Sequence, residues 1–412
     1  MATTILLICT LATDPYSVHW AASNLQQNLQ TYACPNDVAF QVQNVTTQTS
    51  CNCNIGIGKS VAQMLHFDYI SGANASLTES FAIGSANTSY ILTGNINNEN
   101  EHQRGTIYAT IDFMERVGLR FLDSTSTVMT RDCPWVSSPS FNSFPKFYTY
   151  SPPLEYRRIL GWDVTRNNEF AQNLFNNGQG QLKVGGGTIY ADPPGFVHTS
   201  YKLLDPNAGN IPPPEVYSKH PEWFWGGNAS YGQLCWSNKS LVEAIKTNVL
   251  QYLTDQPDAT VISISQNDNF NYCNTSSERE IYNDEGGSLI GPILRAVNEI
   301  ADEVKKTFPN RDIAIDTLAY QWTRAAPTKT YPRKNVIIRL CSIECNFGAP
   351  LSDPSNAKFQ TDIINWGKFS QRTWIWNYAT DFANYVMPWP DCMLFNLILF
   401  FIGCISFAVE AV

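Results

Sequence analysis

The second part of the chain alternates strand-like with helix-like segments, and this alternation limits the possible folds more than any other feature. The strand-like runs are short and rich in β-branched and aromatic residues. They lie at residues 158–162, 185–190, 233–236, 260–265, 312–318, 335–341, 372–376 and 405–409. Strands separated by helices form a parallel sheet through right-handed crossovers, and seven or eight such units close into a barrel. The sequence therefore predicts an α/β fold with a (β/α)8, TIM-like barrel over residues 150–412.

Two places depart from a regular barrel. Between the fifth and sixth runs only residues 323–334 are available, and Pro327 and Pro332 lie within them, so we expect a single helical turn there at most. No helical pattern follows the last run, and the barrel is therefore expected to be incomplete at its C-terminus.

The apolar segment 392–409 leaves two interpretations open. Its length is close to that of a membrane-spanning helix, which would make it a C-terminal membrane anchor. Glu410 follows it directly and no basic residue flanks it, which favours the second interpretation, a short helix and an eighth strand of the barrel.

The first part of the chain has a different pattern, in which a strand, a helix, several strands and a second helix follow one another. The second helix is predicted within the segment 104–122, where Ile107, Ile111 and Met114 recur at helical spacing and Gly118 is placed as the helix stop. These elements predict a small α+β domain over residues 1–135. A proline-rich stretch, 133–153, then connects it to the barrel domain.

Composition excludes some partners and favours a compartment. The net charge is −9 and no basic run occurs, so nucleic acid is not an expected partner. Asn-x-Ser/Thr triplets occur at Asn44, Asn74, Asn87, Asn228, Asn238 and Asn274. Together with 11 cysteines they indicate a glycoprotein with disulfides, located outside the cell or in the lumen of the secretory pathway.

The stretch 260–272, TVISISQNDNFNY, is the best candidate for a site. A buried β-branched run ends abruptly in amide and carboxylate side chains, and parallel sheets place their chemistry at the carboxyl ends of the strands. The alternative is an Asx-rich turn that only ends the strand. Polar groups also follow the other runs, and the candidates collected in this way are Asp163, Asn267, Asp268, Tyr320, Glu344, Asn377, Asp381 and Glu410. Glycoside hydrolysis requires such a set of carboxylates, whereas each one alone is more often a helix cap or a loop ion pair.

Metal and cofactor sites are not expected. The chain has 5 His, and neither HxH nor HExxH spacing occurs. The glycines at 185–187 lack the GxGxxG spacing of a dinucleotide site. His198 remains a candidate for contact with a substrate, because histidine titrates near neutral pH.

The chain from about residue 104 onward resembles a glycoside-hydrolase-like family, the domain of unknown function numbered 4838. In that family a domain like those of α-glucuronidases and β-hexosaminidases precedes a barrel, an architecture similar to that of families 20 and 67. The matching stretches are RGTIYATIDFMERVGLRFL, HPEWF, QLCWSN, ISQNDNFNYC, DTLAYQWTR, VIIRLCSIECNF and IWNYATDF. Family-20 hexosaminidases end the fourth strand with an Asp-Glu pair, whose places are taken here by Asn267 and Asp268. The resemblance thus implies Asp268 as general acid, while the neutral Asn267 departs from the substrate-assisted mechanism.

These observations predict a glycoside hydrolase acting on a glycan, either a hexosaminide or a uronide. Asp268 is the predicted general acid, and Glu344 the predicted base, nucleophile or stabiliser. The residues predicted to bind the sugar are Asp163, His198, Asn267, Tyr320, Trp376, Asn377 and Glu410. One alternative is a carbohydrate-binding pseudoenzyme on the same scaffold. Another is a structural protein held at the cell surface by the apolar C-terminus.

Overall fold

The computed structural model describes residues 4–36, 38–46, 53–67, 79–94, 104–135, 140–178, 184–227 and 231–378, together with the backbone of 407–411. The chain forms two compact units. The first comprises Met1–Pro153 and Ile159–Gly187, and the second comprises Leu154–Arg158 and Thr188–Val412. The first unit thus includes 159–187, a stretch that the sequence analysis places in the barrel domain.

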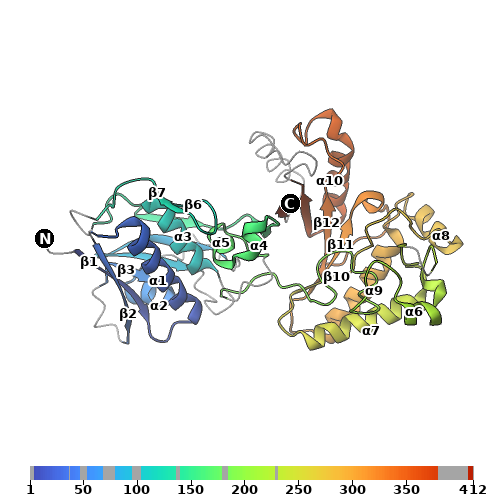
Figure 1. Ribbon diagram of the computed structural model, residues 1–412, viewed down its shortest axis with the longest axis horizontal. Helices are drawn as coiled ribbons and strands as arrows, with labels where there is room; N and C mark the ends of the chain where they lie inside the picture. The colour runs from blue at the N-terminus through green and yellow to red at the C-terminus, as the bar shows by residue number, and fades with distance from the viewer. Residues whose placement is uncertain are drawn as a thin grey trace. The chain divides into compact units, whose positions relative to one another are not determined.

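The first unit is built on a six-stranded sheet with the order β2-β1-β3-β5-β4-β8 (Figure 1). Its strands are β1 (Thr4–Leu11), β2 (Val38–Val45), β3 (Ile55–Ile57), β4 (Phe81–Ala86), β5 (Ser89–Gly94) and β8 (Phe147–Tyr150). β6 (Leu119–Phe121) and β7 (Thr127–Met129) form a separate hairpin. The helices are α1 (Tyr16–Asn28), α2 (Lys59–Met64), α3 (Gly105–Val117), α4 (Trp162–Arg166) and α5 (Asn168–Asn173).

Helix α3 confirms the predicted helical pattern. Ile107, Ile111 and Met114 are fully buried in the core that α1 and the sheet share, and Gly118 ends the helix at φ +124°, where a side chain would be strained. A disulfide joins Cys34 to Cys133 within this unit.

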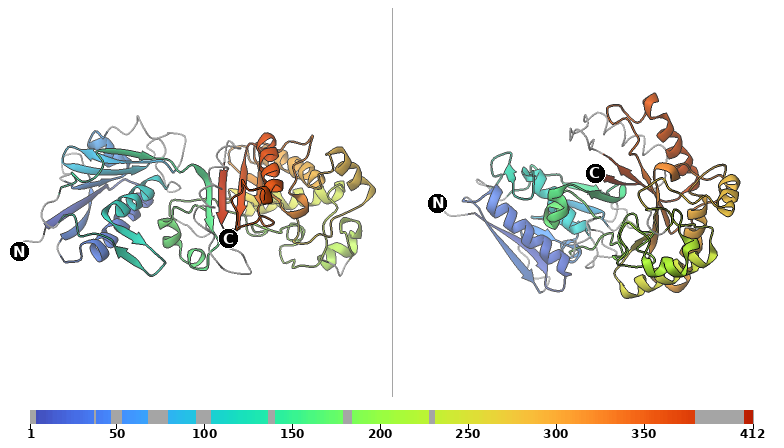
Figure 2. Two further views of the ribbon diagram at one scale, coloured as in Figure 1. Left: turned by 90° about the horizontal axis from the view of Figure 1, so that it is seen from above. Right: turned by 45° about the vertical axis from the view of Figure 1, so that its right-hand side comes forward.

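The second unit contains a six-stranded sheet with the order β10-β11-β12-β13-β14-β9. The orange and dark red strands of this sheet are seen in Figure 2. Its strands are β9 (Leu154–Ile159), β10 (Val261–Ser263), β11 (Ala314–Ala319), β12 (Val336–Cys341), β13 (Thr373–Asn377) and β14 (Phe407–Ala411). The helices are α6 (Pro214–Lys219), α7 (Lys239–Asp255), α8 (Ser276–Asp284), α9 (Gly291–Thr307) and α10 (Ala357–Phe369). The pairs from β10 through β14 are parallel, as predicted.

Both faces of this sheet are buried. Successive side chains of a strand point to opposite faces, and every residue of β11, β12 and β13 is buried. Ile262, Ile315 and Ile338 point into the core shared with α7 and α9. The opposite side chains form a second cluster consisting of Tyr156, Val261, Ala314, Ile337 and Trp374, with Tyr190 packed against it. Tyr156 of β9 stacks on Trp374 of β13 with ring centroids 4.1 Å apart, so this second cluster joins strands that are not neighbours in the sheet.

The described residues do not form a complete (β/α)8 barrel, and two predicted strands are wrong. Residues 185–190 contribute only a parallel bridge from Tyr190 to Val261. Their glycines Gly185, Gly186 and Gly187 all adopt positive φ, which breaks an extended strand. Residues 233–236 contribute only an antiparallel bridge from Leu234 to Phe224.

Other predictions about the second unit are confirmed. Only one 3-10 turn, Gln321–Thr323, stands between β11 and β12 among the described residues, as the two prolines led us to expect. β14 overlaps the predicted eighth strand, although most of the apolar segment 392–409 lies outside the described residues. In the part of the chain that is described, no helix has the length and apolar composition needed to cross a membrane.

Candidate active site

The candidate site lies at the carboxyl ends of three neighbouring parallel strands. Asp268 comes after β10, Tyr320 follows β11 directly, and Glu344 comes after β12. Because β10, β11 and β12 are consecutive in the sheet and run in the same direction, their carboxyl ends share one edge. The sheet thus places Tyr320 between the two predicted catalytic carboxylates.

Tyr320 and Asp268 are in direct contact. The Tyr320 hydroxyl donates a hydrogen bond of 3.0 Å to Asp268 Oδ1, and the Gln321 Nε2 amide donates one of 3.0 Å to the same hydroxyl. Tyr320 is buried, whereas Asp268 is exposed. The backbone N–H of Asp268 donates to the Tyr231 hydroxyl at 2.9 Å. One tyrosine hydroxyl therefore binds the exposed carboxylate of Asp268, and a second binds its backbone.

The electrostatics connect Tyr320 to both carboxylates. Burial raises the pKa of the Tyr320 phenol, the negative charge of Asp268 and its hydrogen bond raise that pKa further, and the charges of Cys341 and Glu344 add to the rise. Burial and the charge of Asp268 also raise the pKa of Tyr231. Both phenols consequently keep their protons at neutral pH and serve as hydrogen-bond donors or acceptors rather than bases.

Glu344 is bound to a buried cation that the sequence analysis missed. Its carboxylate accepts a hydrogen bond from Arg324 Nη1, and Arg324 Nε lies 2.6 Å from Asp362 Oδ2. The side chains of Arg324 and Asp362 are 4% and 7% exposed, whereas that of Glu344 is 42% exposed. Burial raises the pKa of Asp362, and the guanidinium of Arg324 opposes that rise. Glu344 therefore reaches solvent while its other side faces a fixed positive charge.

Helix α10 fixes this arginine. Asp362 and Trp366 both belong to α10, and the Trp366 indole N–H donates to the Arg324 carbonyl at 2.7 Å. The Arg324 guanidinium also lies 5.6 Å from the ring centroid of Phe359. A flexible arginine is thus held in a single orientation by three side chains of one helix.

His198 completes the surroundings of Tyr320. Its Nδ1 lies 2.9 Å from the Gln266 carbonyl, and because a carbonyl only accepts, Nδ1 carries the hydrogen of this bond. The imidazole centroid lies 5.9 Å from that of Tyr320. His198 and Gln321 both adopt left-handed backbone conformations, with φ of +51° and +52°. Strained non-glycine residues of this kind cluster at functional sites.

The remaining predicted residues occupy different environments. Asn267 is buried and donates from Nδ2 to the Gly232 carbonyl at 2.7 Å, so it secures a loop. Trp376 stacks between Phe196 and Tyr378, with centroid distances of 6.1 Å to each. Asn377 Oδ1 accepts from the Ser342 hydroxyl at 3.1 Å.

Three of the candidate residues are not part of this cluster as the structure describes it. Asp163 belongs to the first unit, where both of its carboxylate oxygens accept hydrogen bonds from Ser124. Glu410 lies in β14 with its backbone paired to Trp376, but its side chain and all of Asp381 lie outside the described residues.

Within the strands, before their carboxyl ends, β11 and β12 carry a buried ion pair. Arg339 of β12 binds Asp316 of β11, and both side chains are essentially inaccessible to solvent. The Tyr190 hydroxyl donates to Asp316 at 3.0 Å and accepts from Arg339 at 2.7 Å.

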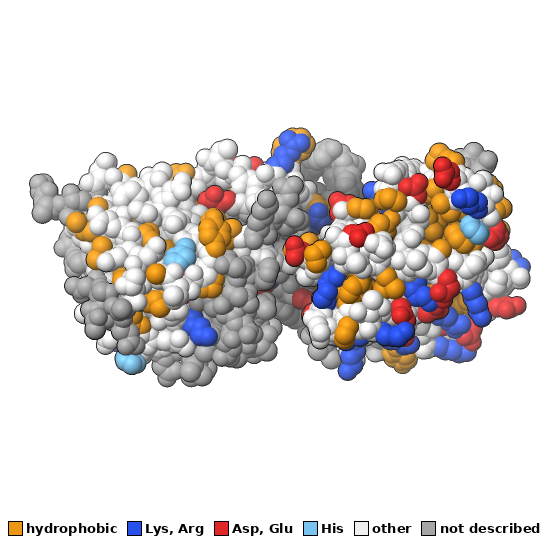
Figure 3. All heavy atoms as spheres, turned by 90° about the horizontal axis from the view of Figure 1, so that it is seen from below, with side chains coloured by type: hydrophobic (Ala, Val, Ile, Leu, Met, Phe, Trp, Pro, Cys, Tyr) orange, Lys and Arg blue, Asp and Glu red, His pale blue; other side chains and the backbone are white. Residues whose placement is uncertain are grey.

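Figure 3 shows that acidic and basic side chains are mixed on the visible outer surface of the second unit. In the described part of the chain, no group of three or more His, Cys, Asp or Glu residues is placed to hold a metal ion.

Comparison with solved structures identifies a glycoside-hydrolase-like fold. A structure described as a family GH115 4-O-methyl-α-glucuronidase with specificity for decorated arabinogalactans matches with a TM-score of 0.56 and 11% identity. The match covers 100% of this chain but 54% of that one, so the chain spans about half of that protein's length. CpGH84D matches with a TM-score of 0.44 and 7% identity, over 99% of this chain and 62% of that one.

Two comparisons of sequence give different results. No curated protein matches this sequence. The finer resemblance to families 20 and 67 stays a prediction. The model of one family, however, matches residues 139–400 and so covers the strands, the loops and both carboxylates of the site. The chain therefore belongs to the family defined by the domain of unknown function DUF4838.

Proposed function

We propose that this protein is a glycoside hydrolase that uses Asp268 as its general acid and Glu344 as its base, nucleophile or charge stabiliser. The observation that carries the proposal is the position of Tyr320. It follows the strand between those of the two carboxylates, bonds to Asp268 and is affected by the charge of Glu344. Two carboxylates on one edge of a parallel sheet can flank a glycosidic bond.

The two environments suggest different roles for the carboxylates. Glu344 forms an ion pair with the Arg324 guanidinium, and a carboxylate held in this way suits a base, a nucleophile or a stabiliser of positive charge on the sugar. The Asp268 carboxylate instead accepts a hydrogen bond from a hydroxyl group, that of Tyr320. After it has given its proton to the leaving oxygen, the Tyr320 hydroxyl would stabilise the carboxylate that forms.

The substrate class follows from the same surroundings. His198 Nε2 and the carboxylates offer hydrogen-bond partners for sugar hydroxyls, and Trp376 belongs to an aromatic row with Phe196 and Tyr378. A glycan is therefore the proposed substrate, with hexosaminides and uronides as the first classes to test. The two disulfides support a secreted or lumenal location.

The test is a screen of the purified protein against aryl hexosaminides and aryl uronides, beside Asp268→Asn and Glu344→Gln. Asp258→Asn is the matched control, because Asp258 is exposed and precedes β10 at the opposite end of the same strand. We expect turnover by the parent and the control, and a loss of about 10²–10⁴-fold in Asp268→Asn.

A carbohydrate-binding pseudoenzyme is the second candidate, and one observation favours it. The Glu344 carboxylate is already engaged by Arg324, as a purely structural ion pair would be. Absence of turnover by every variant, with glycan binding retained by all, would support this candidate. Absence of both turnover and binding would contradict the two candidates together.

A further inference from the structure

Residues 231–235, which we call the supporting segment, lie against the loop that carries Asp268. Residues 233–236 were predicted as a strand, but they are not part of the six-stranded sheet of this unit. The polar groups of the supporting segment bond instead to residues 266–273, which we call the acid loop. Resting on the proposed function, we infer that the supporting segment positions the general acid, and that Gln233 is its principal positioning residue.

Gln233 bonds to the acid loop through both polar atoms of its side chain and through its backbone N–H. Its Oε1 accepts from the Asn267 backbone N–H at 3.0 Å, and its Nε2 donates to the carbonyls of Asn267 at 2.8 Å and Asn269 at 3.0 Å. Its own backbone N–H donates to the Asn271 carbonyl at 3.1 Å. The side chain is 0% exposed, so these bonds form without competition from water.

The two residues before Gln233 also bond to the acid loop, at Asn267 and Asp268. The Gly232 carbonyl accepts from Asn267 Nδ2 at 2.7 Å, and the Tyr231 hydroxyl accepts from the Asp268 N–H at 2.9 Å. Gly232 has no room for a side chain, because a Cβ atom would lie 1.9 Å from the Trp225 carbonyl oxygen. Close backbone approach is therefore built into the segment.

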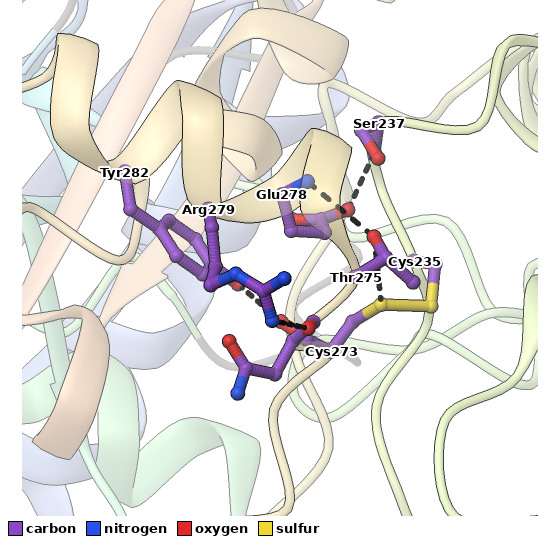
Figure 4. The surroundings of a disulfide bond; sticks show 8 residues. Cys235, Ser237, Cys273, Thr275, Glu278, Arg279 and Tyr282 are labelled. Carbon is purple, nitrogen blue, oxygen red and sulfur yellow. Dashed lines mark hydrogen bonds between the residues drawn. A yellow bond between two sulfur atoms is a disulfide. The ribbon is translucent and has the colours of Figure 1, made fainter.

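A disulfide closes the far end of the acid loop. Cys235 is bonded to Cys273, with the Cα atoms 5.2 Å apart (Figure 4). Figure 4 also shows the hydrogen bonds that anchor this end to α8, where the Tyr282 hydroxyl donates to the Cys273 carbonyl at 2.7 Å and Thr275 caps the helix at Glu278. The buried Glu278 carboxylate accepts from the Ser237 N–H at 2.6 Å. Both ends of the acid loop are consequently fixed.

The consequence is chemical, because the Asp268 side chain is exposed and its carboxylate is bonded to the Tyr320 hydroxyl. Its position depends on the backbone of the acid loop, and general acid catalysis requires the carboxyl group within hydrogen-bond reach of the leaving oxygen. Gln233 never touches the substrate in this scheme. It acts by fixing the backbone from which Asp268 projects.

The experiment compares two aryl glycosides of one sugar, with phenol or 2,4-dinitrophenol as the leaving group. Dinitrophenol departs without a proton, whereas phenol needs the acid, so displacement of the acid alone slows the phenyl substrate selectively. Gln233→Glu keeps the size of the side chain but replaces the donor that faces two carbonyls with an acceptor. We expect kcat to fall about tenfold or more on the phenyl glycoside and less than about threefold on the dinitrophenyl glycoside.

Gln172→Glu is the matched control, since Gln172 is a buried glutamine of the first unit that also donates to a backbone carbonyl. It should leave the ratio of the two rates unchanged. Tyr231→Phe is the second variant, should Gln233→Glu fold poorly, and its effect should have the same selectivity. Equal losses on both substrates in Gln233→Glu and Tyr231→Phe would overturn the positioning role.

Hydrogen exchange separates this inference from the proposed function. In Gln233→Glu the amides of Asn267 and Asp268 should exchange faster than in the parent, whether or not any glycoside is turned over. If the parent turns over no substrate but these amides lose protection in Gln233→Glu, the proposed function is wrong and the role of Gln233 in fixing the acid loop is still supported. Unchanged protection would refute the support itself.

Discussion

The Tyr320 hydroxyl and Asp268 Oδ1 lie 3.0 Å apart, and the phenol is the donor. Burial and neighbouring negative charges raise the pKa of that phenol, so it keeps this proton over the whole neutral range. The contact therefore supplies a hydrogen bond to the Asp268 carboxylate, which is the form that a general acid reaches once it has transferred its proton.

Tyr320→Phe should accordingly lower kcat by about 10- to 100-fold, because hydrogen bonds to charged groups contribute roughly 1.5–3 kcal/mol. The measurement is steady-state turnover of whichever aryl glycoside the parent accepts. Tyr252→Phe is the control, since it removes a tyrosine hydroxyl that donates to the Lys202 carbonyl elsewhere in the second unit. Equal rates in the parent and Tyr320→Phe would remove the phenol from the proposed mechanism.

Arg324 and Asp362 form a nearly buried ion pair, and breaking it should be costly. Arg324→Met leaves the Asp362 carboxylate without its cation, and we expect a loss of about 3–5 kcal/mol in the free energy of unfolding. The double variant Arg324→Met with Asp362→Leu should lose less than Arg324→Met alone. Denaturant unfolding measures both. The exposed pair of Arg333 and Asp302 offers the comparison, where Arg333→Met should cost at most about 1 kcal/mol. Purely additive losses at Arg324 and Asp362 would contradict this account.

Glu278 should make stability depend on pH. Burial raises the pKa of this carboxyl above its ordinary value of 4.5, so the folded protein binds the proton more tightly than the unfolded chain does. The stabilisation is complete below pH 4.5 and is lost as the pH rises through the folded-state pKa. Glu278→Gln cannot ionise, and its stability relative to the parent should therefore increase over that interval. Melting temperatures of both proteins from acid to neutral pH would show it, and a constant difference would count against it.

The two disulfides should contribute similarly to stability but differently to function. Their Cys residues are 38 and 99 positions apart, for which the chain-entropy model gives about 4 and about 4.7 kcal/mol. Replacement of Cys235 and Cys273 by serine should also reduce turnover, because that pair closes the acid loop. Replacement of Cys34 and Cys133 should destabilise the first unit while the remaining folded protein keeps its specific activity. Unaltered turnover in the first variant would show that the acid loop holds its conformation without the covalent link.

The parallel strands that carry the site could be predicted, because their β-branched runs are continuous and helical patterns separate them. Val261, Ile315 and Ile338 all lie within predicted runs. The position of Tyr320 between Asp268 and Glu344 follows from the same reasoning, since neighbouring parallel strands end at one edge.

The sequence was less informative wherever distant contacts decide the backbone. QLCW at 233–236 has the composition of a strand, yet Gln233 bonds to the acid loop and Cys235 to Cys273, a pairing that spacing alone does not reveal. Arg324 was missed because it follows a short turn rather than a strand, and its burial depends on Asp362 of a helix later in the chain. Asp163 had the right place after a predicted strand, but the chain there turns into α4 and the carboxylate binds Ser124.

The order of strands in the second unit has a consequence for biosynthesis. β9 begins this unit in the sequence, yet its neighbour in the sheet is β14, the last of the described strands along the chain. Pairing between the two must await synthesis of everything from β10 to β13, and contacts between such distant segments form slowly. On the ribosome β9 would thus emerge long before its neighbour. Chaperones that shield β9 during translation should then affect the yield of the second unit more than that of the first, whose paired strands are closer in sequence.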